Sequence, residues 1–187
     1  MAKLYFKYGA MGSSKTAQAL ITKFNYEERG HKVLLVKPAT DDRDGATVIK
    51  SRIGLYSEAF VIADEVGAIK KKLSEEKASV LIVDECQFLS KEQVLEIRNI
   101  VSEFDIPVLC FGLRTDFSGE LFEGSKALFA LADSIAEIKS ICDCGNKAIV
   151  NARIDKSGKI IANGPQVLIG GNESYKPMCW KCWWENR

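Results

Sequence analysis

The sequence predicts an α/β fold in which helices flank a parallel sheet, followed by a small β-rich lobe. Up to about Asp133, short apolar runs alternate with longer amphipathic stretches, which is the pattern of strands and helices in such a sheet. Several of the apolar runs lack polar alternation, as expected of strands buried on both faces. From Cys142 onward the sequence is rich in Gly, Asn and Lys and has no long helical pattern, which favours a separate lobe.

Composition limits the class of protein. The chain has 187 residues, enough for one compact domain with a small appendage, and its net charge is +1. This balance gives no general reason to expect a nucleic acid or an anionic membrane as partner. The first residues do not form a signal-peptide core, and no apolar stretch approaches roughly 18 uncharged residues. We therefore expect a cytoplasmic protein that binds neither nucleic acid nor membrane.

The first predicted elements surround a glycine-containing loop. Residues 3–8 (KLYFKY) are predicted to form a strand, and residues 15–30 a helix that Gly30 closes. The next strand is predicted at residues 32–37 (KVLLVK), with Pro38 ending it.

The middle of the chain continues the alternation of helix and strand. A surface helix is predicted at residues 63–77, and a strand with an acidic end at residues 79–85 (SVLIVDE). The following helix, at residues 90–104, opens with Ser90 and Gln93 in the spacing of a capping box.

The last part of the predicted sheet contains one more strand and one more helix. We place the strand at residues 106–113 (IPVLCFGL) and the helix at residues 120–133, despite Gly124. Residues 134–141 are expected to lead away from the sheet. In the lobe that follows, residues 155–159 (DKSGK) predict a hairpin turn.

The segment GAMGSSKT lies between a predicted strand and a predicted helix, as a phosphate-binding P-loop requires. Backbone N–H groups of such a loop and the positive end of the helix bind phosphate oxygens. Lys15 would reach the β- and γ-phosphates of a nucleotide, and the Thr16 hydroxyl would bind Mg²⁺. The alternative is a turn capped by Ser13 or Ser14.

Ser14 stands where the P-loop pattern has its second glycine. A serine there costs roughly 1 kcal/mol of strain if its φ is positive. Gly12, two residues earlier, supplies part of the lost freedom. We expect a less adaptable loop that still binds ATP.

The segment VLIVDECQF resembles a Walker B strand. Its Asp84 would hold the Mg²⁺ of the nucleotide, so the two motifs predict one site at the carboxyl ends of adjacent strands. Glu85 follows at the edge of that site, where a carboxylate can take a proton from an attacking hydroxyl or water. The alternative for Glu85 is a supporting or salt-bridged carboxylate.

The six cysteines divide into two groups. Cys86 and Cys110 lie in apolar segments and are interpreted as buried thiols. The other four form two close pairs, which favour a structural Zn²⁺ with four thiolates and no open coordination position. They are Cys142, Cys144, Cys179 and Cys182.

The first cysteine pair is one residue shorter than the usual spacing, although Gly145 permits the turn that the second ligand needs. An incomplete ligand set, a disulfide and free thiols remain alternatives. The tryptophans beside the last ligand, Trp180, Trp183 and Trp184, could cover the metal site, join a subunit interface or be partly exposed.

These motifs together resemble one family. The segments GAMGSSKT, DECQF and GLRTDFSGELF and the two late cysteine pairs occur in this order in a short chain, and the combination resembles the type II thymidine kinases. The resemblance covers nearly the whole chain. It implies a P-loop NTPase-like kinase domain at residues 1–140, and a zinc-binding lobe at residues 141–187 whose lasso loop closes over the nucleoside.

The implied reaction is transfer of a phosphate from ATP to the 5′-hydroxyl of thymidine, with deoxyuridine as a second substrate and Glu85 as the catalytic base. The resemblance also implies a loop, residues 40–45, in which Arg43 offsets charge during transfer; the alternative is a polar turn. The implied ATP- and phosphate-binding residues are Gly9, Ala10, Met11, Gly12, Ser13, Ser14, Lys15, Thr16, Asp41, Arg43, Asp84 and Gln87.

The implied nucleoside pocket combines apolar side chains with backbone groups of the lasso loop. Its apolar walls would bury the pyrimidine, and the alternative for the aromatic residues is that they belong to the ordinary core. Its implied residues are Met11, Phe88, Leu113, Phe117, Phe122, Gln166, Val167, Leu168, Ile169, Gly170 and Tyr175.

The chain departs from the family pattern at three positions. Ser14 replaces a glycine, Gly12 replaces a bulky residue, and Arg114 stands where aspartate is usual, so that it would alter sugar contacts or pair with Asp116. Two other functions therefore stay open: a P-loop ATPase whose zinc ribbon binds nucleic acid, and a non-catalytic nucleotide-binding homologue. A homotetramer and feedback inhibition by thymidine triphosphate are implied by the resemblance alone.

Overall fold

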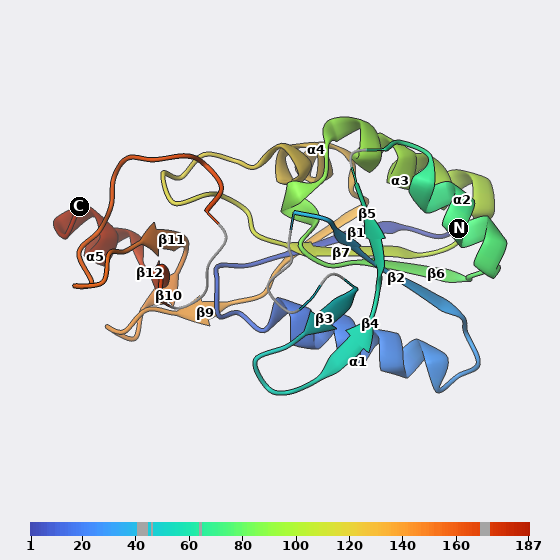
Figure 1. Ribbon diagram of the computed structural model, residues 1–187, viewed down its shortest axis with the longest axis horizontal. Helices are drawn as coiled ribbons and strands as arrows, with labels where there is room; N and C mark the ends of the chain where they lie inside the picture. The colour runs from blue at the N-terminus through green and yellow to red at the C-terminus, as the bar shows by residue number, and fades with distance from the viewer. Residues whose placement is uncertain (41–44, 46, 64, 169–172) are drawn as a thin grey trace.

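The computed structural model describes residues 1–187 except 41–44, 46, 64 and 169–172. Its main body is a six-stranded sheet in the order β5-β2-β6-β7-β1-β8, and every neighbouring pair is parallel (Figure 1). The strands are β1 (Leu4–Tyr8), β2 (Val33–Pro38), β5 (Phe60–Ile62), β6 (Val80–Val83), β7 (Val108–Gly112) and β8 (Ser134–Glu137). The predicted α/β class is confirmed.

Helices cover both faces of this sheet (Figure 1). One face packs against α1 (Lys15–Glu27). The other packs against α2 (Ala68–Glu76), α3 (Lys91–Phe104) and α4 (Glu123–Leu131). Alternate side chains of one strand point to opposite faces, so Leu34 and Val36 of β2 join the core beneath α2–α4, whereas Val33 and Leu35 join the core beneath α1.

The capping box predicted at the start of α3 is present. The Ser90 hydroxyl accepts from the Gln93 backbone N–H, and the Gln93 side chain accepts from the Ser90 N–H. Helix α2 begins later than predicted, because the Glu96 carboxylate of α3 accepts hydrogen bonds from the N–H groups of Gly67 and Lys70.

The expectation that residues 134–141 lead away from the sheet is wrong at its start. Residues Ser134–Glu137 form β8 and pair in parallel with β1 at the edge of the sheet. Outside the lobe, three further strands among the described residues were not predicted: edge strand β5 and the hairpin of β3 (Val48–Lys50) and β4 (Tyr56–Glu58). Each of these three has only three residues, too few to show a periodic pattern.

Gly124 allows α4 to lie directly on a short 3-10 helix, η1 (Cys86–Phe88). A Cβ at Gly124 would lie 2.4 Å from the Cys86 carbonyl oxygen and 2.8 Å from that of Leu89. The predicted helix therefore forms around this glycine, since the close approach leaves no room for a side chain.

The small lobe lies at one end of the molecule (Figure 1, left). It contains two antiparallel pairs, β9 (Ser140–Ile141) with β10 (Lys147–Ala148) and β11 (Val150–Arg153) with β12 (Tyr175–Met178), and ends in helix α5 (Trp180–Glu185). The predicted turn at residues 155–159 is confirmed, because a bridge joins Ile154 to Ile160 around it.

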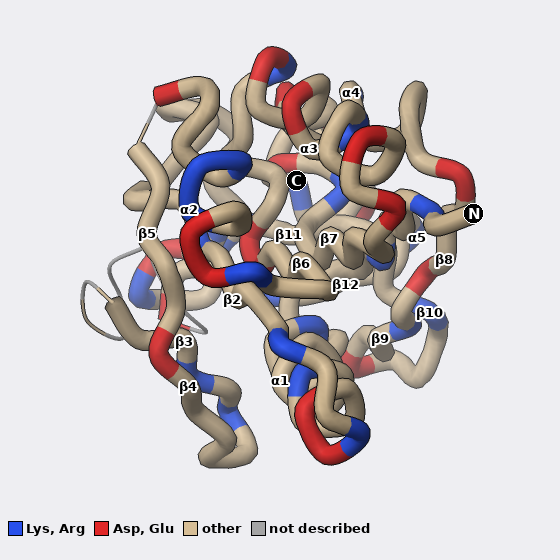
Figure 2. Tube along the Cα trace, turned by 90° about the vertical axis from the view of Figure 1, so that its right-hand side faces the viewer, with Lys and Arg blue, Asp and Glu red and all other residues tan. Residues whose placement is uncertain are grey.

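Basic and acidic residues are interspersed along much of the chain trace (Figure 2). On α1, Lys23 pairs with Glu27, and on α2, Lys72 pairs with Glu76, each four residues apart. None of the described helices combines the length and apolar character needed to span a bilayer.

Candidate active site and metal centre

The P-loop has the strand, loop and helix context that the sequence predicts. Ser14 precedes α1 in the left-handed conformation, with φ 62°, and its side chain makes no capping hydrogen bond. Gly12 also has a positive φ, 73°. The first N–H groups of α1 are therefore not used by a serine cap and can face an anion.

Lys15 is buried beside this loop. Its Nζ donates to the Ala10 carbonyl oxygen at 2.9 Å and to the Ser13 Oγ at 3.3 Å. Burial lowers the pKa of Lys15, whereas the nearby carboxylates of Glu85 and Asp84 act in the opposite direction. The ammonium group thus already lies close to both acidic residues of the site.

Asp84 follows β6 and is only 2% exposed. Burial and the neighbouring Glu85 raise the pKa of Asp84 to about 7, and a hydrogen bond with the Thr16 side chain opposes this shift. The two residues expected to bind Mg²⁺ therefore touch. Their strands are not adjacent as predicted, because β7 lies between β6 and β1; the carboxyl ends still meet because all three strands are parallel.

Glu85 has a left-handed backbone, with φ 51°, an uncommon conformation for a residue other than glycine. Gln87 holds its carboxylate: the Gln87 Nε2 donates to Glu85 Oε2 at 2.6 Å, and the Gln87 Oε1 accepts from the Leu113 N–H at 3.0 Å. This amide thus links the end of β6 to the end of β7.

Two pockets meet at this point. The larger one, a cleft with about 1640 Å³ of empty space including its mouth, contains residues 14–17 and Asp84. The smaller one has about 470 Å³ and an apolar wall. Met11, Glu85 and Leu113 line both, so a carboxylate stands where the contents of the two pockets would come together.

The smaller pocket contains every described residue that the resemblance places around a nucleoside. Phe88 and Phe122 meet edge to face with ring centroids 5.8 Å apart, and Phe122 is only 6% exposed. Phe122 therefore belongs both to the core and to the pocket wall. The predicted residues found there are Met11, Phe88, Leu113, Phe117, Phe122, Gln166, Val167, Leu168 and Tyr175, whereas Ile169 and Gly170 lie outside the described residues.

Arg153 of β11 anchors the segment that contains Gln166 and Leu168, and sequence reasoning missed it. Its guanidinium donates to the carbonyl oxygens of Pro165 and Gln166 at 2.9 and 3.3 Å and to the Tyr175 hydroxyl at 2.8 Å. It also lies 3.8 Å from the centre of the Phe117 ring. An arginine in a strand carries no sequence signal for such a role.

Three further residues of the smaller pocket were not predicted: Thr115, Asp116 and Asn151. The Asp116 carboxylate accepts from Ser118, Glu120 and the Gln166 side chain. Arg114 contacts the Ile149 carbonyl oxygen at 3.3 Å and the Tyr8 ring instead of forming the anticipated pair with Asp116 among the described residues.

The larger cleft also has basic residues that were not predicted. Arg52, from the β3–β4 hairpin, lines it, and its guanidinium would lie 3.7 Å from a Cβ at Gly12. Lys37 of β2 is buried and donates to the carbonyl oxygens of Gly45 and Val48. Asp41 and Arg43, which the resemblance places near the phosphates, lie outside the described residues.

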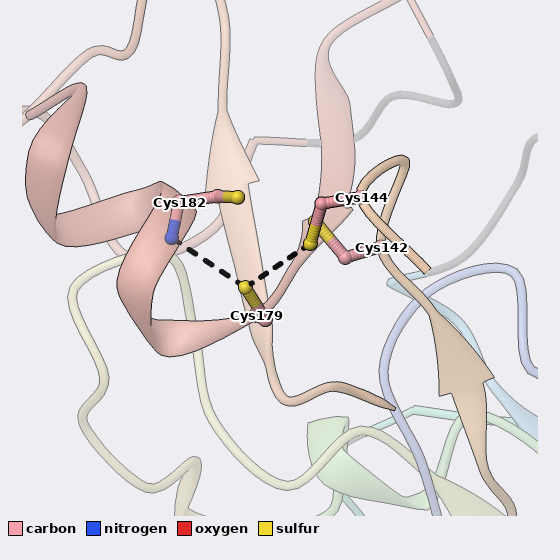
Figure 3. Close-up of side chains that lie close together, drawn as sticks. All are labelled: Cys142, Cys144, Cys179 and Cys182. Carbon is pink, nitrogen blue, oxygen red and sulfur yellow. Dashed lines mark hydrogen bonds between the residues drawn. The ribbon is translucent and has the colours of Figure 1, made fainter. Parts of the chain in front are cut away.

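All four predicted cysteines come together in the lobe (Figure 3). Their sulfur atoms lie within 4.8 Å of one another, and those of Cys144 and Cys179 are 3.6 Å apart. Tetrahedral zinc with bonds of about 2.3 Å requires sulfur atoms about 3.8 Å apart, so this donor set fits zinc. The two pairs are Cys142 with Cys144 and Cys179 with Cys182.

Local structure explains why both short pairs converge. Cys179 is the N-cap of α5, and its Sγ accepts from the Cys182 N–H at 3.5 Å. In the first pair, Gly145 has a φ of 85° and donates its N–H to the Cys142 carbonyl oxygen, as anticipated for a tight turn. Hydrogen bonds lower the pKa of the Cys144 thiol to about 6, and the largest contribution comes from the Asn146 backbone. This shift favours the thiolate form, which is the form that binds a metal.

The three tryptophans have different environments. Trp183 is 2% exposed and packs against Val150 and Ala152, so it forms the core of the lobe. Trp180 and Trp184 are more than half exposed and stack on each other with ring centroids 6.1 Å apart.

The sequence matches known proteins over nearly its whole length. A family model described as "Thymidine kinase" matches residues 2–183. A thymidine kinase of Shewanella oneidensis is 49% identical over 184 residues, 97% of this chain and 96% of the relative. Those of Aliivibrio fischeri and Vibrio cholerae are each 48% identical over 182 residues, 96% of this chain and 95% of the relative. The chain therefore belongs to the thymidine kinase family.

Proposed function

We propose that this protein transfers the γ-phosphate of ATP to the 5′-hydroxyl of thymidine, with ATP in the larger cleft and thymidine in the smaller pocket. The observation that carries this proposal is the position of Glu85, which lines both pockets. Family membership supports the reaction, and the linings of the two pockets support the assignment of ATP to the larger cleft and thymidine to the smaller pocket.

In the proposed step, the 5′-hydroxyl oxygen forms a bond to the γ-phosphorus while the bond to the bridging oxygen of ADP breaks. The Glu85 carboxylate accepts the hydroxyl proton, and Gln87 keeps that carboxylate in place through its 2.6 Å hydrogen bond. Lys15 and the first N–H groups of α1 bind the phosphate oxygens, where negative charge moves during transfer.

Thr16 and Asp84 would hold the Mg²⁺ that accompanies ATP. A hydroxyl and a carboxylate are ligands that this ion accepts, and the two side chains already share a hydrogen bond. When bound, the ion neutralises charge on the β- and γ-phosphates. The contacts of Asp41 and Arg43 with the phosphates remain predictions from the family resemblance.

The smaller pocket suits a pyrimidine nucleoside. Phe88, Phe117 and Phe122 supply apolar and aromatic surface, and the segment from Gln166, with Tyr175, closes the opposite side. Backbone groups of this segment can match O2, N3–H and O4 of thymine without a dedicated side chain. The division into a kinase domain at residues 1–140 and a lobe with the lasso loop at residues 141–187 stays part of this proposal.

We assign the four-cysteine site to a structural zinc ion. Four thiolates complete a tetrahedral set and leave no position for a substrate. A homotetramer and feedback inhibition by thymidine triphosphate stay predictions from the family.

The test uses the purified zinc-containing protein, ATP with Mg²⁺, and a panel of four nucleosides: thymidine, deoxyuridine, deoxycytidine and deoxyadenosine. Mass spectrometry of the products should detect thymidine 5′-monophosphate, and ADP should form in equal amount. Equal consumption of ATP with all four nucleosides, with none of them phosphorylated, would favour an ATPase. Salt-sensitive binding of single-stranded DNA would support that outcome. ATP binding without any turnover would favour a non-catalytic homologue.

A further inference from the structure

Asn151 lies where the small lobe meets the smaller pocket and the P-loop. It belongs to β11, lines the smaller pocket and is only 3% exposed. A buried side-chain amide needs partners for both its oxygen and its nitrogen, so its hydrogen bonds identify what it holds.

The two ends of this amide bind backbone groups from two other parts of the chain. Its Oδ1 accepts from the Met11 N–H at 2.8 Å, and its Nδ2 donates to the Thr115 carbonyl oxygen at 2.9 Å. The amide orientation follows from these partners, since an N–H must face the oxygen and a carbonyl must face the nitrogen. A leucine of similar size could make neither bond, and a serine hydroxyl is too short to span both.

Other contacts from the lobe hold the same part of the P-loop. The Ser140 hydroxyl donates to the Met11 carbonyl oxygen at 3.4 Å. Ala10 packs among the buried cysteines Cys142 and Cys179 of the four-cysteine site. Both backbone polar groups of Met11 are therefore bonded to the lobe and its connection to the sheet, not to the loop itself.

Met11 lines both pockets, whereas Thr115 lines only the smaller one. A ligand in the smaller pocket that orders Thr115 also orders the Met11 backbone through Asn151. A ligand in the larger cleft that orders Met11 orders Thr115 in the same way. Each ligand thereby orders backbone that the other ligand requires. A second ligand then binds at a lower entropic cost, which is a reciprocal coupling between the two sites.

We propose that Asn151 is a positioning residue that couples the nucleoside pocket to the P-loop by holding the Met11 backbone against Thr115. The proposal rests on the proposed function, in which thymidine occupies the smaller pocket and ATP the larger cleft. A purely structural role would lower stability without changing how one substrate affects the binding of the other.

The test compares the unmodified protein with the variants Asn151→Leu and Asn151→Ser. Asn163→Ser is the matched control, because Asn163 is an exposed residue of the same lobe. Calorimetry measures the thymidine Kd with and without a non-hydrolysable ATP analogue and Mg²⁺, and zinc content and thermal unfolding are measured for each protein.

In the unmodified protein and the control, the analogue should tighten thymidine binding by about fivefold or more. In Asn151→Leu that ratio should fall close to one, and kcat should drop by about tenfold, as expected when buried backbone groups lose a hydrogen-bond partner. An unchanged ratio in a folded, zinc-containing Asn151 variant would overturn the proposal.

Hydrogen exchange in the unmodified protein provides a test without any substitution. Thymidine alone should slow exchange in peptides covering residues 12–16, which do not line its pocket, and the ATP analogue alone should slow exchange at residues 115–117. No change in either region would contradict the coupling. If the unmodified protein neither binds nor phosphorylates thymidine, the proposed function fails; if it does both without coupling, only the role of Asn151 is rejected.

Discussion

Ser14 has the left-handed backbone, φ 62° and ψ 25°, that P-loops ordinarily obtain from glycine. A serine tolerates it at a cost of roughly 1 kcal/mol because its side chain is small and unbranched at Cβ. This backbone conformation is part of the folded loop itself, in which Gly12 also has a positive φ. The strain therefore affects the stability of the fold more than the binding of ATP.

Replacing Ser14 by valine should lower the free energy of unfolding by about 1–2 kcal/mol, since a branched Cβ is poorly accommodated at positive φ. Chemical denaturation measures this change. Ser14→Gly is the control and should stay within about 0.5 kcal/mol of the unmodified protein, because relief of strain is offset by the greater entropy of the unfolded chain. A valine variant as stable as the parent would show that Ser14 does not adopt this conformation.

The residues predicted from the sequence are those whose role follows from their position next to a predicted strand. Lys15 and Asp84 were predicted because each stands at a fixed place after a strand. Asn151 and Arg153 were not, because what they hold, Met11 and Pro165, depends on how the lobe folds back. Nothing in the neighbouring sequence distinguishes a polar strand residue that reaches a pocket from one that faces solvent.

Among the helices and strands, the periodic helices and the continuously apolar strands were predicted, whereas the short edge strands were not. The 14 residues of α3 show an apolar face and a capping box. The three residues of β5 show neither, and the four residues of β8, SIAE, have no regular alternation of apolar and polar side chains, so this strand was not assigned to the sheet. Pairing along the sheet edge, a tertiary property, determines both strands.

The segment closing the nucleoside pocket depends on Arg153. We expect Arg153→Lys to raise the KM for thymidine by about tenfold while the ATP Kd changes less than about twofold, because lysine cannot reproduce the bidentate contacts or the stacking on Phe117. Steady-state kinetics and ATP titration separate the two effects.

Arg29→Lys is the matched control for this substitution, since Arg29 is exposed beyond the end of α1 and its side chain donates only to the Asn25 carbonyl oxygen among the hydrogen bonds of the described residues. Equal thymidine KM values in the Arg153 variant and the control would reject the role of Arg153 in closing the pocket.

At the scale of the whole molecule, the lobe and the sheet domain complete one site together. The lobe is too small to be stabilised by apolar burial alone, and its four cysteines surround one point beside Ala10 of the P-loop. Loss of the metal should therefore disturb both pockets.

Removing zinc with a chelator should shift the tryptophan emission to longer wavelength, because Trp183 is buried in the lobe whereas Trp180 and Trp184 are already exposed. Thymidine binding should fall at least tenfold in parallel, since Asn151 and Arg153 belong to the lobe strand β11. Adding zinc back should restore both signals. Unchanged emission and binding in protein shown to be metal-free would contradict a structural role.

In the proposed mechanism, Glu85 takes the proton of the nucleoside hydroxyl where the two pockets meet. The most direct measurement is the rate of phosphate transfer from ATP to thymidine by Glu85→Gln, with the thymidine Kd determined on the same protein. Glutamine keeps the size of the side chain but is not a base, so kcat should fall by about 100-fold or more while the Kd stays within about threefold. A variant that turns over as fast as the unmodified protein would contradict this mechanism.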